Sequence, residues 1–543
     1  MSTPGQPYIS NGQVLERYEL PAGFPVPRDH AQIVTYLSAI LSMRISEILK
    51  ANDALCSPPL TTRIVRWIDD VYFFFGLYFV TLFSLRDRNS IFTDQETHTT
   101  IDRAGVVALE EVVPVVLVVA VAALGELEGL MISGGLSARA VVDEIIYRRA
   151  AGKFKLDPKE NSPVHPTSLC WIASMTKLVT AVAMMQLIER GLASLDEDVC
   201  DTLPELKDID ILLQDKENPG RGVPEDSVSV SPNANGGGNP DQYTGFRTEK
   251  ARGKITVKDL LCHTSGLCYD HSSPLLQQWS KSIKRKSNTF CGSLDGYHHP
   301  LLFEPGTSWA YGGGLDWAGA MIERKTGTTL EDYMKANIWS KVGATCTTFH
   351  PEKNRDELPP QLEMGLRIRT ESGNTRISPG RVILEYPRKN DLGGIGLFGT
   401  ADDYIKFLAA LLQGGRGLLS ESSVEALFQP RLDRAIRSSM LVGAGKQMRR
   451  ILGAKDTYDI DQADHCLGGT VTLRDIPGRR RKGTVSWAGL PNLHWWIDRE
   501  SGIAATLFTQ LLPPMDAIVA DLLMELEEGF CCVVVSARIA YEG

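Results

Sequence analysis

The sequence predicts a mixed α/β (α+β) fold in which an antiparallel sheet is flanked by helices. A helix is expected over 178–190, because this stretch is apolar on most faces and is followed by Gly191, a C-terminal stop signal. Two antiparallel strands joined by a turn are expected within 484–510. Because a helix that is apolar nearly all round is buried, this helix should run through the core beside the sheet. The chain has 543 residues, of which 43% are hydrophobic, and this is ample for a large core.

Composition and charge exclude several classes of function. The net charge of -9 and the pI of about 5.7 argue against nucleic acid as a partner. The ten cysteines are scattered singly apart from Cys531-Cys532, and no Cys-x-x-Cys pair occurs, so neither a disulfide framework nor a zinc site is expected. No basic region followed by an apolar stretch occurs within 1–28, so no secretory signal peptide is expected. We therefore predict a cytoplasmic protein that needs no metal or other cofactor.

Two apolar runs, Val71–Leu85 and Val112–Leu124, raise the question of a membrane. Both are shorter than the roughly 18 to 20 uncharged residues that span a bilayer, so no spanning helix is expected. Attachment of the first run to a membrane surface stays open as an alternative.

Ser174 and Lys177 are three residues apart at the start of the predicted helix. Residues with this spacing lie side by side on a helix, so the amine should reach the hydroxyl. A serine hydroxyl is a poor nucleophile until a neighbouring base takes its proton. The apolar residues after Lys177 would favour a neutral, basic amine. This pair therefore predicts an acyl-transfer nucleophile.

Two further motifs follow in order. With Trp171–Lys177, the segments Leu260–Leu267 and Phe303–Tyr311 make the chain similar to the serine beta-lactamase and penicillin-binding-protein superfamily, in particular its esterase and acyltransferase branch. The resemblance implies a beta-lactamase-like fold, with a largely helical domain beside the sheet and Ser174 at their seam. It makes His263 a structural histidine bonded to backbone.

The resemblance also implies that Tyr311 is catalytic. A phenol serves as general base when a nearby cation favours the phenolate, so Lys177 beside Tyr311 would act with it as one unit. Which of the two is the base stays open. The alternative for Tyr311 is a packed loop aromatic.

A third motif lies at Gly483–Asn492. Where the lactamases carry Lys-Thr-Gly, this chain has Trp487-Ala488-Gly489, as the esterases and acyltransferases of the branch do. The resemblance implies an oxyanion hole made by the backbone N–H groups of Ser174 and Leu490, and substrate binding by Trp487 and Gly489.

The second motif departs from the family pattern at Gly313, also a candidate substrate-binding position, where an asparagine is frequent. The missing lysine and the missing amide favour ester or thioester substrates over lactams.

The segments Gly489–Arg499, Cys466–Gly469 and Thr509–Pro514 extend the resemblance to fungal transesterases of the lovastatin-acyltransferase type. The resemblance implies a serine acyltransferase that moves an acyl group from a carrier-protein or coenzyme A thioester to a hydroxyl of a small polyketide-type acceptor. Two alternatives remain: a carboxylesterase of the same fold, and an inactive relative that acts as a binding protein.

The expected organisation is an N-terminal extension over 1–90, a catalytic domain over 91–530 and a tail over 531–543. The resemblance places the first core strand at Val113–Val121 and the next near Ile145, so residues 122–144 are interpreted as an insertion. Residues 216–254 are interpreted as a long surface loop. The glycine-rich segment Gly393–Thr400 is interpreted as an active-site wall or a tight turn.

Overall fold

The structure is a computed structural model. It describes strands β1 (Tyr8–Ser10), β2 (Gln13–Leu15) and β3 (Leu117–Ala123), and residues 145–542 except 158, 161, 215–244, 354, 370–374 and 455–458. The chain divides into two units, 1–88 and 89–543. In the first unit, β1 pairs antiparallel with β2. The apolar run Val71–Leu85 lies outside the described residues.

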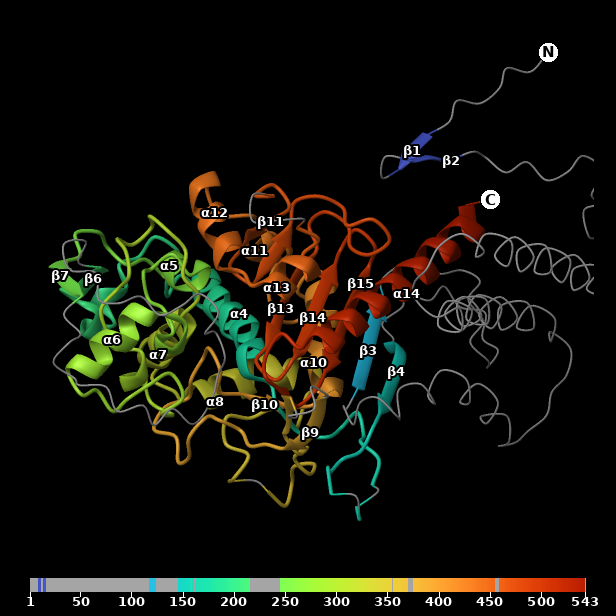
Figure 1. The fold of residues 1–543 in the computed structure, drawn as a ribbon, viewed down its shortest axis with the longest axis horizontal. Helices are drawn as coiled ribbons and strands as arrows, with labels where there is room; N and C mark the ends of the chain where they lie inside the picture. Colours follow the sequence, from blue (N-terminus) through green and yellow to red (C-terminus); the bar gives the residue numbers. More distant parts are fainter. Residues whose placement is uncertain are drawn as a thin grey trace, which may run out of the picture. The chain divides into compact units, whose positions relative to one another are not determined.

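The second unit is built on a sheet whose neighbouring strands all pair antiparallel (Figure 1). In sheet order its strands are β11 (Ala463–His465), β12 (Thr470–Thr472), β13 (Val485–Gly489), β14 (Leu493–Asp498), β15 (Ile503–Phe508), β3 and β4 (Ile145–Ala151). Two antiparallel strands are predicted within 484–510, and the structure has three there, β13, β14 and β15. The antiparallel pairing is confirmed, and the predicted number of strands is too low.

The early strands β3 and β4 form one end of this sheet, next to the late strand β15. Strand β3 pairs with β15 on one side and with β4 on the other, so that Val118 faces Phe508 and Ala150. The observed β3 starts and ends a few residues later than the expected 113–121. Most of the proposed insertion, 124–144, lies outside the described residues, and the two strands that flank it are paired.

Helices cover both faces of the sheet. Along β15, alternate side chains point to opposite faces. Ile503, Ala505 and Leu507 pack with residues of α14 (Ala517–Glu542), whereas Ala504 and Phe508 pack in the core that includes α10 (Ala401–Leu412). The boundary that we place at 530 falls within α14.

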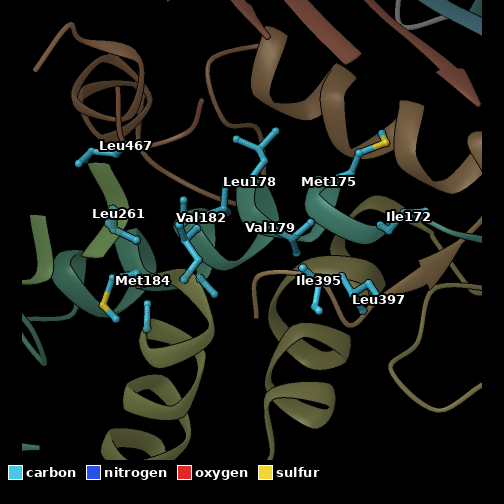
Figure 2. Close-up of a cluster of buried hydrophobic side chains, with 14 of the residues drawn as sticks. Ile172, Met175, Leu178, Val179, Val182, Met184, Leu261, Ile395, Leu397 and Leu467 are labelled. Carbon is cyan, nitrogen blue, oxygen red and sulfur yellow. The ribbon is translucent and has the colours of Figure 1, made fainter. Parts of the chain in front are cut away.

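The predicted central helix is α4 (Thr176–Glu189), and Gly191 follows it with a left-handed φ of 69°. Its residues from Thr176 to Leu187 are all buried, which explains the apolar sequence on every face. Figure 2 shows side chains of α4 among those of three other segments. The labelled neighbours are Leu261, Ile395, Leu397 and Leu467.

The helical part lies between β4 and β11 in sequence (Figure 1). Its other α-helices are α5 (Val257–Cys262), α6 (Pro274–Ser282), α7 (Gly314–Thr326), α8 (Leu330–Met334), α9 (Ser340–Val342), α11 (Glu421–Phe428), α12 (Arg434–Gly443) and α13 (Lys446–Ile451). No helix among the described residues combines the length and the apolar character needed to cross a bilayer.

Three small sheets complete the described chain. They pair β5 (Cys170–Trp171) with β10 (Phe398–Gly399), β6 (Asp210–Gln214) with β7 (Phe246–Lys250), and β8 (Gly365–Arg369) with both β9 (Thr375–Pro379) and β16 (Leu511–Leu512). Strand β7 falls inside the loop predicted over 216–254. Its last four residues are exposed, so it lacks the apolar alternation by which a strand is recognised.

Candidate active site

The segment before α4 holds Ser174 under backbone constraint. Ser174 lies in a single 3-10 turn, Ala173–Met175, and Ala173 has a φ of 45°, a left-handed conformation that L-residues with a side chain rarely adopt. Gln510, next to β16, fixes the preceding strand: its Oε1 accepts from Trp171 N at 3.1 Å and its Nε2 donates to Trp171 O at 3.1 Å. The seam between the sheet and α4 therefore sets the position of Ser174.

Lys177 lies beside Ser174, as the spacing predicts. Its Nζ is 3.3 Å from Ser174 Oγ, and it also donates to Tyr269 OH at 2.8 Å and to Gly394 O at 2.8 Å. These three contacts match the three N–H donors of an ammonium group. Lys177 is 4% exposed and Ser174 is 8% exposed. The site thus holds a serine hydroxyl beside a buried lysine amine.

Tyr311 contacts Lys177 through its ring. The Nζ lies 4.7 Å from the ring centroid of Tyr311, within the range of a cation–π interaction. The Tyr311 hydroxyl accepts a hydrogen bond from Trp487 Nε1 at 3.2 Å, and the Trp309 ring stacks on the Tyr311 ring with a centroid distance of 6.3 Å. We call Trp309, Tyr311 and Trp487 the aromatic wall. All three are half-buried.

The ring of His263 packs against two members of the aromatic wall, Trp309 and Tyr311. Its Nδ1 accepts a hydrogen bond from Gly312 N at 3.4 Å, and its ring centroid is 4.8 Å from that of Tyr311. Burial, with smaller effects from His465 and Lys177, lowers the pKa of His263 well below its usual value. The ring is therefore neutral near pH 7, and its bond to backbone agrees with the structural role expected for it.

Two of the three remaining predicted positions, Gly489 and Gly313, lie at points of close approach. A Cβ on Gly489 would lie 2.6 Å from the carbonyl oxygen of Ile172, so the end of β13 that leads to Leu490 packs directly against the Ser174 segment. A Cβ on Gly313 would lie 2.5 Å from the Tyr297 ring. An asparagine at position 313 therefore has no room beside Tyr297.

Tyr269 and Asp316 also belong to the site, and sequence reasoning missed both. Asp316, in the first turn of α7, is 0% exposed, and its Oδ1 accepts from Gly394 N at 2.9 Å. Burial raises the pKa of Asp316 to about 6, and the Lys177 charge and the hydrogen bonds from Gly394 and Tyr269 oppose this rise. The only available signal was that Tyr269 follows the Leu260–Leu267 motif by two residues.

Gly394 lies in the glycine-rich segment Gly393–Thr400. Its carbonyl oxygen accepts a hydrogen bond from Lys177 Nζ, so the segment borders the candidate site. The same segment also forms a turn, in which Gly396 N donates to Leu392 O at 2.8 Å. Its role as an active-site wall stays a prediction. Within the part of the chain that the structure describes, no group of three or more His, Cys, Asp or Glu residues is arranged to hold a metal ion.

The comparisons with known proteins agree with this geometry. The beta-lactamase family model matches residues 128–528. Monacolin J acid methylbutanoyltransferase of Aspergillus terreus is 30% identical over 407 residues, which cover 73% of this chain and 90% of that protein. Lovastatin esterase of Penicillium rubens is 30% identical over 386 residues, which cover 71% of this chain and 89% of that protein.

Among solved structures, unliganded simvastatin synthase (LovD) from Aspergillus terreus is similar, with a TM-score of 0.61 and 28% identity over 77% of this chain and 94% of that chain. The fold, the motifs and these relatives agree. The chain belongs to the beta-lactamase family, as an enzyme of its acyltransferase and esterase branch.

Proposed function

We propose that this protein is a serine acyltransferase that moves an acyl group from a thioester donor to a hydroxyl of a small polyketide-type acceptor through an acyl-Ser174 intermediate. The observation that carries the proposal is the 3.3 Å contact between Ser174 Oγ and Lys177 Nζ at a largely apolar site. The transferase names of the methylbutanoyltransferase relatives support this assignment.

In the acylation step, Ser174 Oγ attacks the thioester carbonyl carbon and gives up its proton to the Lys177–Tyr311 unit. The C–S bond then breaks, and the thiol leaves with a proton returned by the same unit. The predicted oxyanion hole is formed by the N–H groups of Ser174 and Leu490, a pairing supported by the close approach of Gly489 to the Ile172 carbonyl.

In the second step, the acceptor hydroxyl gives its proton to the Lys177–Tyr311 unit and attacks the acyl carbon. The C–O bond between the acyl group and Ser174 then breaks, and the unit returns the proton to Ser174 Oγ. We infer that the aromatic wall binds an apolar acyl donor or acceptor, because its rings are half-buried and the Tyr311 ring lies against Lys177. For the donor, a carrier-protein thioester and a coenzyme A thioester present the same reacting group.

A carboxylesterase is the second candidate, supported by the similarity to lovastatin esterase. The two functions share the acyl-Ser174 intermediate and differ only in whether an alcohol or water resolves it. They therefore differ in how the rate of donor consumption responds to an acceptor.

The experiment measures thiol release from short branched acyl thioesters, with and without a polycyclic secondary alcohol, in the wild type and in Ser174→Ala. A transferase forms the ester product and consumes donor faster when the alcohol is present. A hydrolase releases acid at the same rate with or without it. Turnover by Ser174→Ala equal to that of the wild type would contradict both functions and leave a binding role.

A further inference from the structure

Asp316 binds one of the two groups that accept from the lysine amine and interacts electrostatically with the other. Its Oδ1 accepts from the N–H of Gly394, whose carbonyl accepts from Lys177 Nζ. The hydroxyl of Tyr269, the other acceptor of Lys177 Nζ, favours the ionised form of Asp316. The carboxylate therefore orients Gly394 through a hydrogen bond and interacts with Tyr269, so it acts on two of the three partners of the lysine amine.

The buried position of the Asp316 carboxylate is energetically unfavourable for its ionised form. Asp316 is 0% exposed, and its Oδ2 is buried with no hydrogen bond to any described residue. A buried charge is unfavourable unless an opposite charge compensates it, and the Lys177 ammonium is the charge that favours ionised Asp316. Asp316 is thus better explained by its effect on Lys177 than by a contribution to folding.

Lysine needs such support because its ammonium sits on a flexible stem of four carbons. The Ser174 contact, at 3.3 Å, is the longest of its three hydrogen bonds, whereas those to Tyr269 and Gly394 are both 2.8 Å. The two shorter bonds fix where the amine lies relative to the serine. Besides Ser174, Tyr269 provides a side-chain acceptor for Lys177 Nζ.

We propose that Tyr269 and Asp316 are positioning residues for Lys177: Tyr269 anchors the amine through its hydroxyl, and Asp316 acts on both anchors and supplies the counter-charge. This inference rests on the proposed acyl-Ser174 chemistry and extends it to two residues with no direct contact to Ser174.

The titration of Asp316 can be distinguished from that of the groups that face it. They are Lys177 from α4, Tyr269 from the loop after α5, and Tyr297 from the loop before α7. Burial raises the pKa of Tyr269 and of Tyr297 well above 10, and burial lowers the pKa of nearby His465 to about 4. His271 stacks on Tyr269 with a centroid distance of 5.5 Å, and burial lowers its pKa below the usual 6.5. An inflection near pH 6 in the acylation rate is therefore assigned to Asp316 by its loss in Asp316→Asn.

The test measures the single-turnover rate of acylation from a short acyl thioester in Tyr269→Phe, with Tyr297→Phe as the matched control. Tyr297 is equally buried, and its hydroxyl donates to Thr289 O rather than contacting Lys177. Loss of a hydrogen bond to a charged group predicts a fall of about 10- to 100-fold in Tyr269→Phe, with the KM for the donor unchanged. Tyr297→Phe should acylate at the wild-type rate.

The second variant is Asp316→Asn, which keeps an acceptor for Gly394 N–H but carries no charge. In the wild type the acylation rate should fall as pH drops through about 6, because the carboxylate becomes protonated. In Asp316→Asn the rate should be low throughout and lack this inflection. A purely structural role would lower the rate without removing the inflection.

Three outcomes overturn the inference: wild-type acylation by Tyr269→Phe, an equal loss in Tyr297→Phe, or an unchanged inflection in Asp316→Asn. A crystal structure of Tyr269→Phe gives a readout independent of activity, and Lys177 Nζ should no longer lie within hydrogen-bond distance of Ser174 Oγ. An amine still at that distance would refute the anchoring role. Absence of any acyl adduct in the wild type would instead contradict the proposed function.

Discussion

The two sides of Lys177 differ in burial and in how their residues are held. On one side, Tyr269 and Asp316 are 3% and 0% exposed and are fixed by short hydrogen bonds. On the other, Tyr311 and Trp487 are half-buried, and one hydrogen bond of 3.2 Å joins them. Burial and fixed geometry suit proton transfer, whereas half-exposed rings suit the recognition of variable apolar groups. Changes on the buried side should therefore alter rate, and changes on the aromatic wall should alter substrate preference.

The largest effect is expected from Lys177→Met, which removes the amine and keeps an apolar side chain. Loss of the group that exchanges the Ser174 proton should lower the acylation rate about 1,000-fold. Stopped-flow release of thiol measures this rate. The control is Lys254→Met, because that side chain is 77% exposed. A loss below about 10-fold would mean that Lys177 is not part of the acid–base unit.

On the buried side, the stability of Asp316→Asn should depend on pH in one direction. Burial raises the pKa of the folded carboxyl to about 6, from 3.8 as the ordinary value for the unfolded chain. Ionisation of Asp316 therefore costs more free energy in the folded state than in the unfolded state. This destabilisation of the wild type is absent below pH 4, where the carboxyl is protonated in both states, and complete above pH 6, where it is ionised in both. From pH 4 to pH 7, the variant should gain about 3 kcal/mol of unfolding free energy relative to the wild type.

Urea unfolding at four pH values between 4 and 7 measures this difference. A constant difference across the range would show that Asp316 is not a costly buried carboxylate, and the contrast between the two sides would lose its electrostatic basis.

Tyr311→Phe tests the point where the two sides meet, because its ring contacts Lys177 and its hydroxyl contacts Trp487. If the hydroxyl exchanges the Ser174 proton, the acylation rate should fall about 100-fold, with the ring contact preserved. Tyr333→Phe is the control, since the Tyr333 hydroxyl donates to Gln186, which lies near the opposite end of α4 from Lys177. An unchanged rate would assign Tyr311 to the wall alone and leave Lys177 as the base.

The smallest effect is expected from Trp487→Phe, which keeps an aromatic ring in the wall and removes the N–H donated to Tyr311. Loss of one neutral hydrogen bond predicts about a fivefold change, seen in the KM for the acyl donor more than in kcat. A series of donors of increasing chain length measures it, with Trp279→Phe on α6 as the control. A loss confined to kcat, equal for every donor, would place Trp487 with the buried side.

The sequence predicted those parts of the site that local spacing determines. Ser174 and Lys177 are three residues apart, so one helical turn brings them together, and the strands at 484–510 carry their own turn signals. Tyr269 lies 92 residues from Lys177, and Gly394 lies 78 residues from Asp316. These contacts depend on how α7 and the loops pack around α4, which no local pattern reports.

Two other features escaped prediction for physical reasons. Strand β7 is largely exposed, so its polar sequence lacked the alternation of a half-buried strand. Helix α14 continues past 530, and Glu527 within it accepts hydrogen bonds from Arg479 and Arg480. These buried ion pairs join α14 to a segment 47 to 48 residues earlier in the chain. No local sequence pattern therefore indicated that α14 extends past 530.

The central claim is that Ser174 carries the acyl group. Intact-protein mass spectrometry after incubation with short acyl thioesters, followed by peptide mapping, tests it most directly. The account predicts the mass of one acyl group on the peptide that contains Ser174, and none in Ser174→Ala. An adduct of equal amount in Ser174→Ala, or no adduct in folded wild-type protein with any donor, would contradict it.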